Sequence, residues 1–323
     1  MSDPYVRHDS QVLVGVESDQ GTSVAPTRTF GKLNGETEMP DPSVDWLEER
    51  SISANGGREL TGKYAGQNSY EGGSLPVNPV DGFPLAFAFG NEQYNDADDE
   101  HVIDVLNAKK PPTATVEATY FGRGGGDDFV RTFAGITPTS VTLTTDNESR
   151  LSTEMETIAM GVSPGTSPTT GITADTRDPF LFDDVSSNLS IAGTTYARVT
   201  EFEHELTTNA SPEYYIAQES GRDPFEVLYA NAEHELTATV KPTDDSLYQS
   251  LLGADDAGEA TITFEKPNGD SIEYVASNVG LEEVPYSFPE EGAAEVSVTL
   301  IPNSVTITVV DTQSTGAYLS AAP

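Results

Sequence analysis

The sequence predicts a mainly β protein, an antiparallel β-sandwich or barrel with one or two short flanking helices and long loops. Three observations support this prediction: apolar and polar residues alternate in many short runs, Gly- and Pro-containing turns separate the runs, and helical spacing is rare. Most runs have one apolar face and one face rich in Thr and Glu, which is typical of antiparallel strands with one side in water. The clearest runs are residues 12–16, 114–120, 201–206, 236–240, 260–264, 272–276, 296–300 and 305–309.

Two turn signals predict hairpins near the C-terminus. An Asn-Gly-Asp turn at 268–270 separates the runs at 260–266 and 271–276, and Asn-Gly is a strong hairpin signal. A Pro-Asn-Ser turn at 302–304 separates the last two runs in the same way. We therefore expect each pair of runs to form neighbouring strands of one sheet.

The best helix candidate is the segment 244–252. Thr243 can cap its N-terminus, two aspartates favour the positive end of the helix dipole, and Gly253 can end it. A weaker candidate covers residues 79–89, where Pro84 lowers the helix propensity.

Two regions rich in turn-forming residues divide the chain. Residues 18–75 contain many Gly, Pro, Ser and acidic residues, and a structureless loop of this length is uncommon in a closed domain. We expect this region to be either disordered or an arm that contacts a neighbour. The expected order is an N-terminal strand at 1–17, the extended arm or loop at 18–75, the first half of a sandwich at 76–160, a linker loop rich in Pro, Gly and Thr at 161–178, the second half at 179–311 and a C-terminal tail at 312–323.

The charge of the chain is extreme. It carries 53 acidic and 16 basic residues, a net charge of −37 at pH 7, yet 36% of its residues are hydrophobic and strand patterns run through most of it, so we predict a folded protein. Repulsion on this scale destabilises a compact state at low ionic strength, whereas at about 1 M salt the Debye length is only ~3 Å. The composition indicates the surface of an extreme halophile's protein. An acidic protein that binds a basic partner or calcium is the alternative.

Several function classes lack their sequence signals. The chain has no cysteine, no stretch of about 20 apolar residues and no start typical of classical secretion. The glycine-rich segment 122–128 lacks the residues of a phosphate-binding loop, and His204 and His234 each lack the second histidine of a zinc motif. No basic stripe suits nucleic-acid binding. We expect no catalytic, cofactor or metal site, although paired acids of the glycosidase type stay open because their separation is not visible in a sequence.

Two stretches resemble the tail tube family of long-tailed double-stranded DNA viruses. Residues 13–26 (LVGVESDQGTSVAP) resemble the start G-x-E-x-x-x-G-T-x-x-x-P that is common in these subunits. Residues 72–79 (GGSLPVNP), the apolar segment that follows them and the run after Pro111 resemble the family's G-S-L stretch, which leads to a short helix and a strand. In the C-terminal half, the runs at 260–264 and 305–311 and the segment 289–292 (PEEG) fit the family as well.

The resemblance implies a fold and a function. It implies a β-sandwich with a flanking helix, six subunits in a ring whose inner strands join into one barrel, and stacked rings through which viral DNA passes without specific binding. Its partners would be copies of itself, other tail proteins such as the tape measure, tail terminator and baseplate hub, and no membrane. The subunit would be made in the host cytoplasm and reside in the virion tail, and the acidic composition points to a virus of a halophilic archaeon.

The remaining expectations concern the contact residues of the arm and two alternative functions. In the arm, we expect Trp46, Leu47, Tyr64 and Tyr70 to contact neighbouring subunits. An acidic β-rich capsid decoration protein or adhesin is one alternative function, and a halophilic carbohydrate-active enzyme is another.

Overall fold

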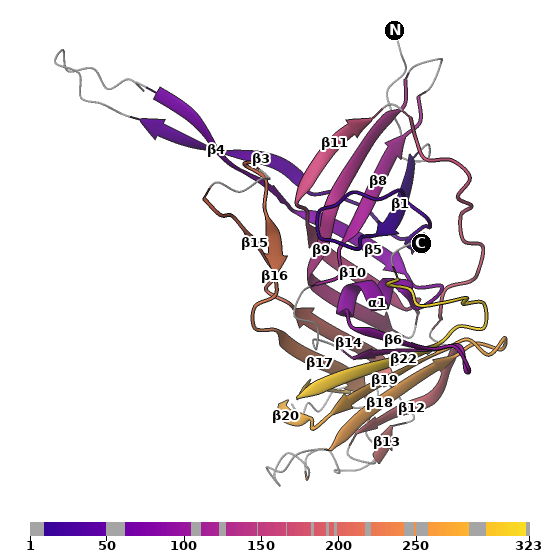
Figure 1. Cartoon of the computed structure of the whole chain (residues 1–323). Helices are drawn as coiled ribbons and strands as arrows, with labels where there is room; N and C mark the ends of the chain where they lie inside the picture. Colours follow the sequence, from indigo (N-terminus) through magenta and orange to yellow (C-terminus); the bar gives the residue numbers. More distant parts are fainter. Residues whose placement is uncertain are drawn as a thin grey trace.

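The computed structural model describes residues 10–49, 62–104, 111–122, 127–146, 148–165, 167–181, 184–191, 194–196, 199–216, 221–241, 249, 258–283 and 295–320. Over these residues the chain forms two large antiparallel sheets and two separate two-stranded hairpins (Figure 1). The predicted mainly β fold is confirmed, and the two large sheets are the layers of a β-sandwich. The helix expected at 244–252 lies outside the described residues, apart from Gln249.

The larger sheet has 11 strands, and β9 connects its two parts. The first half of β9 pairs with β8 and β11, and its second half pairs with β10 and β14. The order along the main path is β2-β5-β10-β9-β14-β17-β21-β20, with β1 attached to β8. The strands are β1 (Ser10–Val16), β2 (Lys32–Leu33), β5 (Gly73–Asn78), β8 (Ala114–Tyr120), β9 (Phe129–Asp146), β10 (Ser152–Ile158), β11 (Gly161–Gly165), β14 (Val199–Thr207), β17 (Glu233–Val240), β20 (Gly280–Glu283) and β21 (Val296–Ile301).

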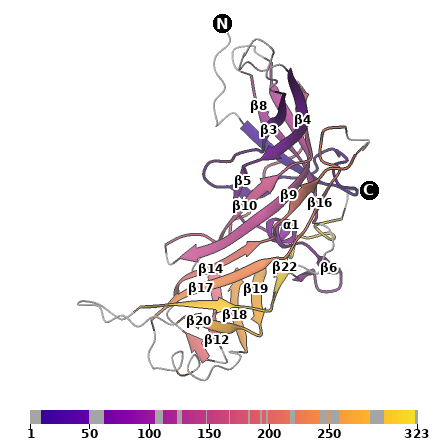
Figure 2. The same ribbon diagram turned by 90° about the vertical axis from the view of Figure 1, so that its left-hand side faces the viewer.

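The second sheet has 7 strands in the order β13-β12-β18-β19-β22-β7-β6. Its apolar face packs on the larger sheet, as the two layers in Figure 2 show, and Phe202 of β14 meets Tyr274 of β19 edge to face with ring centroids 5.4 Å apart. The alternating residues predicted to be apolar are buried here, which supplies the main driving force for folding. The strands are β6 (Glu92–Asn95), β7 (Glu100–Asp104), β12 (Val185–Ile191), β13 (Thr194–Tyr196), β18 (Glu259–Glu265), β19 (Ser271–Ser277) and β22 (Ser304–Val310).

One short helix, α1 (Phe83–Phe89), packs inside the fold, with all seven residues buried. Pro84 lies in its first turn, where the missing N–H costs no helical hydrogen bond. Phe83 and Phe87 both pack on Phe30, each with ring centroids 5.5 Å apart. The helix therefore ties the segment before β2 to the core.

Two hairpins stand apart from the sandwich. Strands β3 (Asp41–Glu49) and β4 (Gly62–Glu71) form a long two-stranded ribbon that projects from the body of the molecule (Figure 1). Strands β15 (Ser211–Glu213) and β16 (Glu226–Leu228) form a shorter one beside its base. We call the β3–β4 ribbon the arm and the segment from Ser211 to Leu228 the brace.

The structure confirms one predicted hairpin and corrects the other. Strands β18 and β19 pair in register across the turn at 268–270, where Gly269 has a φ of +92°. The turn at 302–304 does not form a hairpin, because β21 pairs with β17 and β20 in the larger sheet while β22 pairs with β19 and β7 in the second sheet. Pro302 is buried at this crossing between the layers. The segment expected as a linker loop, 161–178, begins with strand β11.

Candidate assembly surfaces

The arm exposes large apolar side chains to solvent. Trp46 is 48% exposed, Leu47 59% and Tyr64 60%, although side chains of these types are usually buried. Leu47 lies opposite Tyr64 in the register, and Trp46 lies opposite Ala65 on the other face of the ribbon. Both faces of the arm therefore carry apolar surface, and a two-stranded ribbon alone in water is only marginally stable. The arm has the properties of an element that is covered by another molecule.

Tyr70 lies at the base of the arm and differs from the other three residues. Its side chain is only 8% exposed, and its hydroxyl donates a hydrogen bond to Asp223 of the brace (2.6 Å). Burial, followed by the hydrogen bond to Asp223 and its charge, raises the pKa of Tyr70 above its usual value. The Asn68 side chain donates to the same carboxylate (2.7 Å), and the Tyr214 hydroxyl donates to the Asn68 carbonyl (2.6 Å). Tyr70 thus fastens the base of the arm to the brace of its own subunit.

The outer face of the larger sheet is acidic and hydroxyl-rich. Across β10, the second half of β9, β14, β17 and β21, every described side chain that points away from the core is Ser, Thr, Glu or Asp, except Ile301 at the end of β21. No Lys or Arg lies within these strand segments. We call this surface the acidic face. Its central residues are Ser140, Thr142, Thr144, Glu154, Glu156, Glu201, Glu203, Glu205, Thr207, Glu235, Thr237, Thr239, Ser297 and Thr299.

Like charges meet on the acidic face. Glu205 lies directly opposite Glu235 in the β14–β17 register. Burial first, and then the charges of Glu201, Glu205 and Glu235, raise the pKa of Glu203 above its ordinary value. The carboxylates of this face therefore repel one another, and salt weakens the repulsion by screening their charges.

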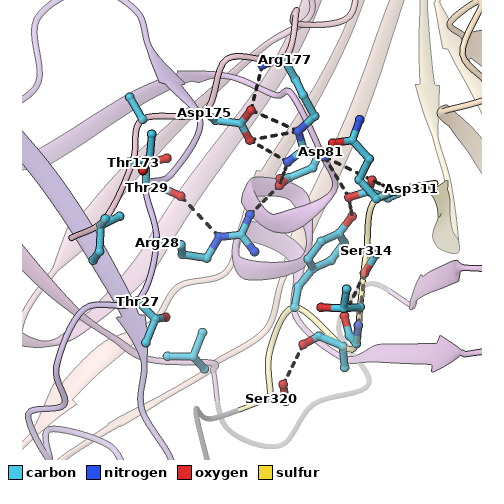
Figure 3. Close-up of a pocket in the computed structure, with 18 of the residues that line it drawn as sticks. Thr27, Arg28, Thr29, Asp81, Thr173, Asp175, Arg177, Asp311, Ser314 and Ser320 are labelled. Atoms are coloured by element: carbon cyan, nitrogen blue, oxygen red, sulfur yellow. Dashed lines mark hydrogen bonds and ion pairs between the residues drawn. The ribbon is translucent and has the colours of Figure 1, made fainter.

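A polar hollow of about 730 Å³ lies between residues 27–29, the segment 171–177 and the C-terminal segment 311–320 (Figure 3). At its floor Arg177 binds three carboxylates, Asp81 (2.6 Å), Asp175 (2.6 Å) and Asp311 (3.2 Å). Burial works to lower the pKa of Arg177, but the hydrogen bond to Asp175 and the other two carboxylate charges outweigh it and the pKa is raised. Arg28 also binds Asp81. The two cations are thus already neutralised by three acids, so the hollow offers no free cation to an anionic ligand.

Ser314, His101 and Glu92 form a hydrogen-bonded chain at the edge of this hollow. His101 Nε2 is 3.0 Å from the Ser314 hydroxyl, and His101 Nδ1 is 2.6 Å from Glu92. The order resembles a hydrolase triad, but the Ser314 hydroxyl donates to the Gly316 carbonyl (3.0 Å), and Glu92 accepts the backbone N–H groups of residues 318–319 (2.8 and 2.7 Å). The chain of contacts fastens the C-terminal segment to β6 and β7.

His204 and His234, the two histidines compared with a zinc motif, stack on each other, with ring centroids 5.4 Å apart. His204 is fully buried, stacks on Phe89 and lies 3.2 Å from Nδ1 of His234 through its Nε2. Burial, and next the neighbouring His234, lowers the pKa of His204, and burial lowers that of His234. Within the described ranges, no three His, Asp or Glu side chains are grouped so that they could hold a metal ion. No described helix is long and apolar enough to span a membrane.

The comparison with protein families gives one match. The model described as phage tail tube protein matches residues 7–309, which is nearly the whole chain. The chain belongs to the phage tail tube protein family. No protein with a curated description matches it. The family makes it a structural component of the virion tail that assembles with copies of itself and with other tail proteins into a tube.

The N-terminal motif that resembles the tail tube family has a structural role. The Glu17 carboxylate is 8% exposed and accepts hydrogen bonds from Gly21 N (2.9 Å), Thr115 Oγ1 (2.8 Å) and Gly135 N (2.9 Å). Gly21 and Gly135 have φ values of +73° and +67°, and a Cβ on either would meet the Met160 side chain. The motif joins the N-terminal loop to β8 and β9 of the sandwich.

Sequence reasoning missed the brace and the acidic face. The brace contains exposed Tyr215 and Ile216, and the run Tyr214-Tyr215-Ile216 was a usable signal because three large apolar residues in a row are unusual in so acidic a chain. The acidic face was visible as Thr and Glu alternation. Its extent depended on strand order, which the sequence did not reveal.

Proposed function

We propose that this chain forms rings of six subunits that stack into the tail tube, and that viral DNA passes through the tube during delivery. Two observations together support the proposal: the chain belongs to a family of tube-forming proteins, and its projecting arm exposes apolar side chains that a neighbouring subunit would cover. Among the described residues, the path of the larger sheet ends at β20, which pairs only with β21. Edge strands of this kind invite pairing with another chain, and ring closure supplies that pairing.

The acidic face would line the bore. It extends over five neighbouring strands of the larger sheet, and it consists mainly of hydroxyl and carboxylate side chains. Duplex DNA carries about one negative charge per 1.7 Å of its axis, and proteins hold it mainly through basic side chains that release counterions. A bore without Lys or Arg in its strands gives DNA no such hold. The DNA would pass without specific binding.

The arm would contact a neighbouring subunit through Trp46, Leu47 and Tyr64. These three side chains supply aromatic and aliphatic surface of the kind that dominates protein interfaces. Further partners would be the tape measure, tail terminator and baseplate hub proteins, with no membrane involved. The subunit would be made in the host cytoplasm before it joins the tail.

A halophilic archaeal host would account for the charge. The net charge of −37 and the repulsion around Glu203 are tolerable only where salt screens them. A subunit of this composition would require molar salt both for its own fold and for the close approach of identical acidic copies.

Electron microscopy of the purified chain in molar KCl tests the assembly. We expect rings or tubes of uniform diameter in negative stain. A chain that stays monomeric at high concentration in molar salt would contradict the proposal and would favour a decoration protein or adhesin, which binds another surface without forming tubes.

Single cysteines test which face lines the bore, because the chain has no native cysteine. Thr237→Cys places a thiol on the acidic face, and Glu273→Cys places one on the outer surface of the second sheet as the matched control. In assembled tubes we expect a bulky polymer-linked maleimide to modify the control but not Thr237→Cys, whereas both react in unassembled subunits. Equal modification of both positions in tubes would exclude the acidic face from the bore.

A further inference from the structure

Basic side chains are scarce in this protein, and their positions are informative. Of the described Lys and Arg residues, five form no ion pair with a described carboxylate: Lys63, Arg131, Arg150, Arg222 and Lys266. Two of these five lie over an exposed aromatic ring, and Arg222 is an exposed residue of the brace. Lys63 Nζ is 4.4 Å from the Trp46 ring centroid, Arg131 Cζ is 3.9 Å from the Phe129 ring centroid, and Arg222 precedes Phe225 by three residues in the brace.

The brace carries the single most exposed apolar side chain of the three places. Ile216 is fully exposed, and Tyr215 and Phe225 are each 48% exposed. The Tyr215 and Phe225 rings meet edge to face with centroids 5.4 Å apart, and the Tyr215 hydroxyl donates to Glu226 (2.8 Å). The two rings are thus held in fixed positions by their own hairpin. Preorganised aromatic surface of this kind is typical of interface anchors, because little side-chain entropy is lost on binding.

The brace and the arm are joined at one place. Asp223 accepts hydrogen bonds from the side chains of Asn68 and Tyr70, and the Asn68 backbone N–H donates to the Arg222 carbonyl (3.0 Å). Since Asn68 and Tyr70 belong to β4, the brace fixes the base of the arm. A neighbour that covers the arm therefore comes close to the exposed surface of the brace.

We propose that Tyr215, Ile216, Arg222 and Phe225 form a second self-association surface, which receives an acidic surface of another copy of this chain. This inference rests on the proposed function and adds a contact site to it. Two observations select the occupant. The brace is hydrogen-bonded to the base of the arm, which the proposed function places against another copy, and the exposed cation Arg222 in the same segment complements a chain that carries 53 acidic residues. Two acidic surfaces repel each other, whereas a cation on one copy attracts the acidic surface of the other copy at the point where they meet.

Two variants of the full chain test the second surface in molar KCl. Ile216→Ser with Phe225→Ser removes the apolar contact, and Arg222→Glu reverses the charge. The matched controls are Leu181→Ser and Arg150→Glu, because Leu181 is also exposed (36%) and Arg150 is another exposed cation without a described ion pair. Sedimentation gives the concentration at which assembly begins, negative stain shows the product, and thermal unfolding of dilute subunits reports whether each variant is folded.

We expect both brace variants to raise the assembly concentration at least about tenfold, which corresponds to ~1.4 kcal/mol. The thermal midpoints of the subunits and the assembly of both controls should stay as in the unmodified chain. The defect of Arg222→Glu should shrink as salt rises, whereas that of the apolar variant should not, because salt screens charges and strengthens apolar burial.

An arm variant separates failure of this inference from failure of the proposed function. If Trp46→Ala with Leu47→Ala loses assembly while both brace variants assemble normally, the brace is not a contact surface and the tube proposal stands. If the unmodified chain forms no rings or tubes, both proposals are wrong. If the controls lose assembly as strongly as the brace variants, the effect is not specific to the brace and the inference is refuted.

Discussion

Replacement of Arg177 by Met is the sharpest test of how the loops around the sandwich are held together. The guanidinium is 19% exposed, and it neutralises Asp81 and Asp311, whose side chains are 2% and 4% exposed. Removal of one partner from a buried ion pair costs about 3–5 kcal/mol, because the other charge stays buried without compensation. Here Asp81 keeps Arg28, and Asp311 keeps the Tyr318 hydroxyl (2.8 Å). We therefore expect the lower end of the range, a loss of about 3 kcal/mol in the free energy of unfolding.

Urea unfolding at constant molar KCl measures this loss, because urea leaves the ionic strength unchanged. Arg150→Met is the control: this arginine is exposed, and the change should stay within about 0.5 kcal/mol. Arg177→Met combined with Asp311→Asn should be more stable than Arg177→Met alone, because it removes one of the stranded charges. The reasoning is refuted if Arg177→Met is as stable as Arg150→Met, or if the double variant is the less stable of the two.

Two further predictions concern pH and charge. Because burial lowers the pKa of His204 and His234 in the folded state, their contribution to stability is present above the unfolded value of about 6.5 and is lost as the pH falls below it. His204→Leu should change stability by less than ~1 kcal/mol at pH 7.5 and should reduce the loss between pH 7 and 5, measured by urea unfolding; an unchanged pH dependence would contradict this. The pKa of Glu203 is raised, so its charged form destabilises the fold and stability should increase as the pH falls toward that pKa. Glu203→Gln should increase the free energy of unfolding by less than ~1 kcal/mol at low salt, and by less still in molar salt, as measured by thermal unfolding. A Glu203→Gln variant that is less stable than the unmodified chain at low salt would exclude repulsion on the acidic face.

The sandwich was predictable because its strands have one buried face. In β19, buried Ile272 and Tyr274 alternate with exposed Glu273, and this alternation is the signal that the sequence carries. The arm gave no such signal for a physical reason: both faces of β3 and β4 are in water, so nothing selects apolar residues at every second position. A strand pattern appears in a sequence only where a buried face imposes it.

Connections between layers were the weakest part of the prediction. The turn at 302–304 was recognised, but a turn signal gives only a change of direction and not the sheet that the next strand joins. Both β21 and β22 bury alternate residues, so neither pattern distinguished a hairpin from a crossing between layers. The Arg177 cluster could not be predicted from the sequence for a similar reason, because its partners Asp81 and Asp311 are 96 and 134 positions away in the chain.

Charge and arm together suggest how such a protein controls its own assembly. A subunit with a net charge of −37 repels its copies at low salt, and the arm and brace present apolar surface that is costly to leave in water at high salt. Rising salt weakens the repulsion and strengthens the apolar contact, so both changes favour association. If association depended on ion pairs alone, rising salt would dissolve the assembly instead. The direction of the salt dependence therefore distinguishes assembly through the arm and brace from assembly through charge pairs.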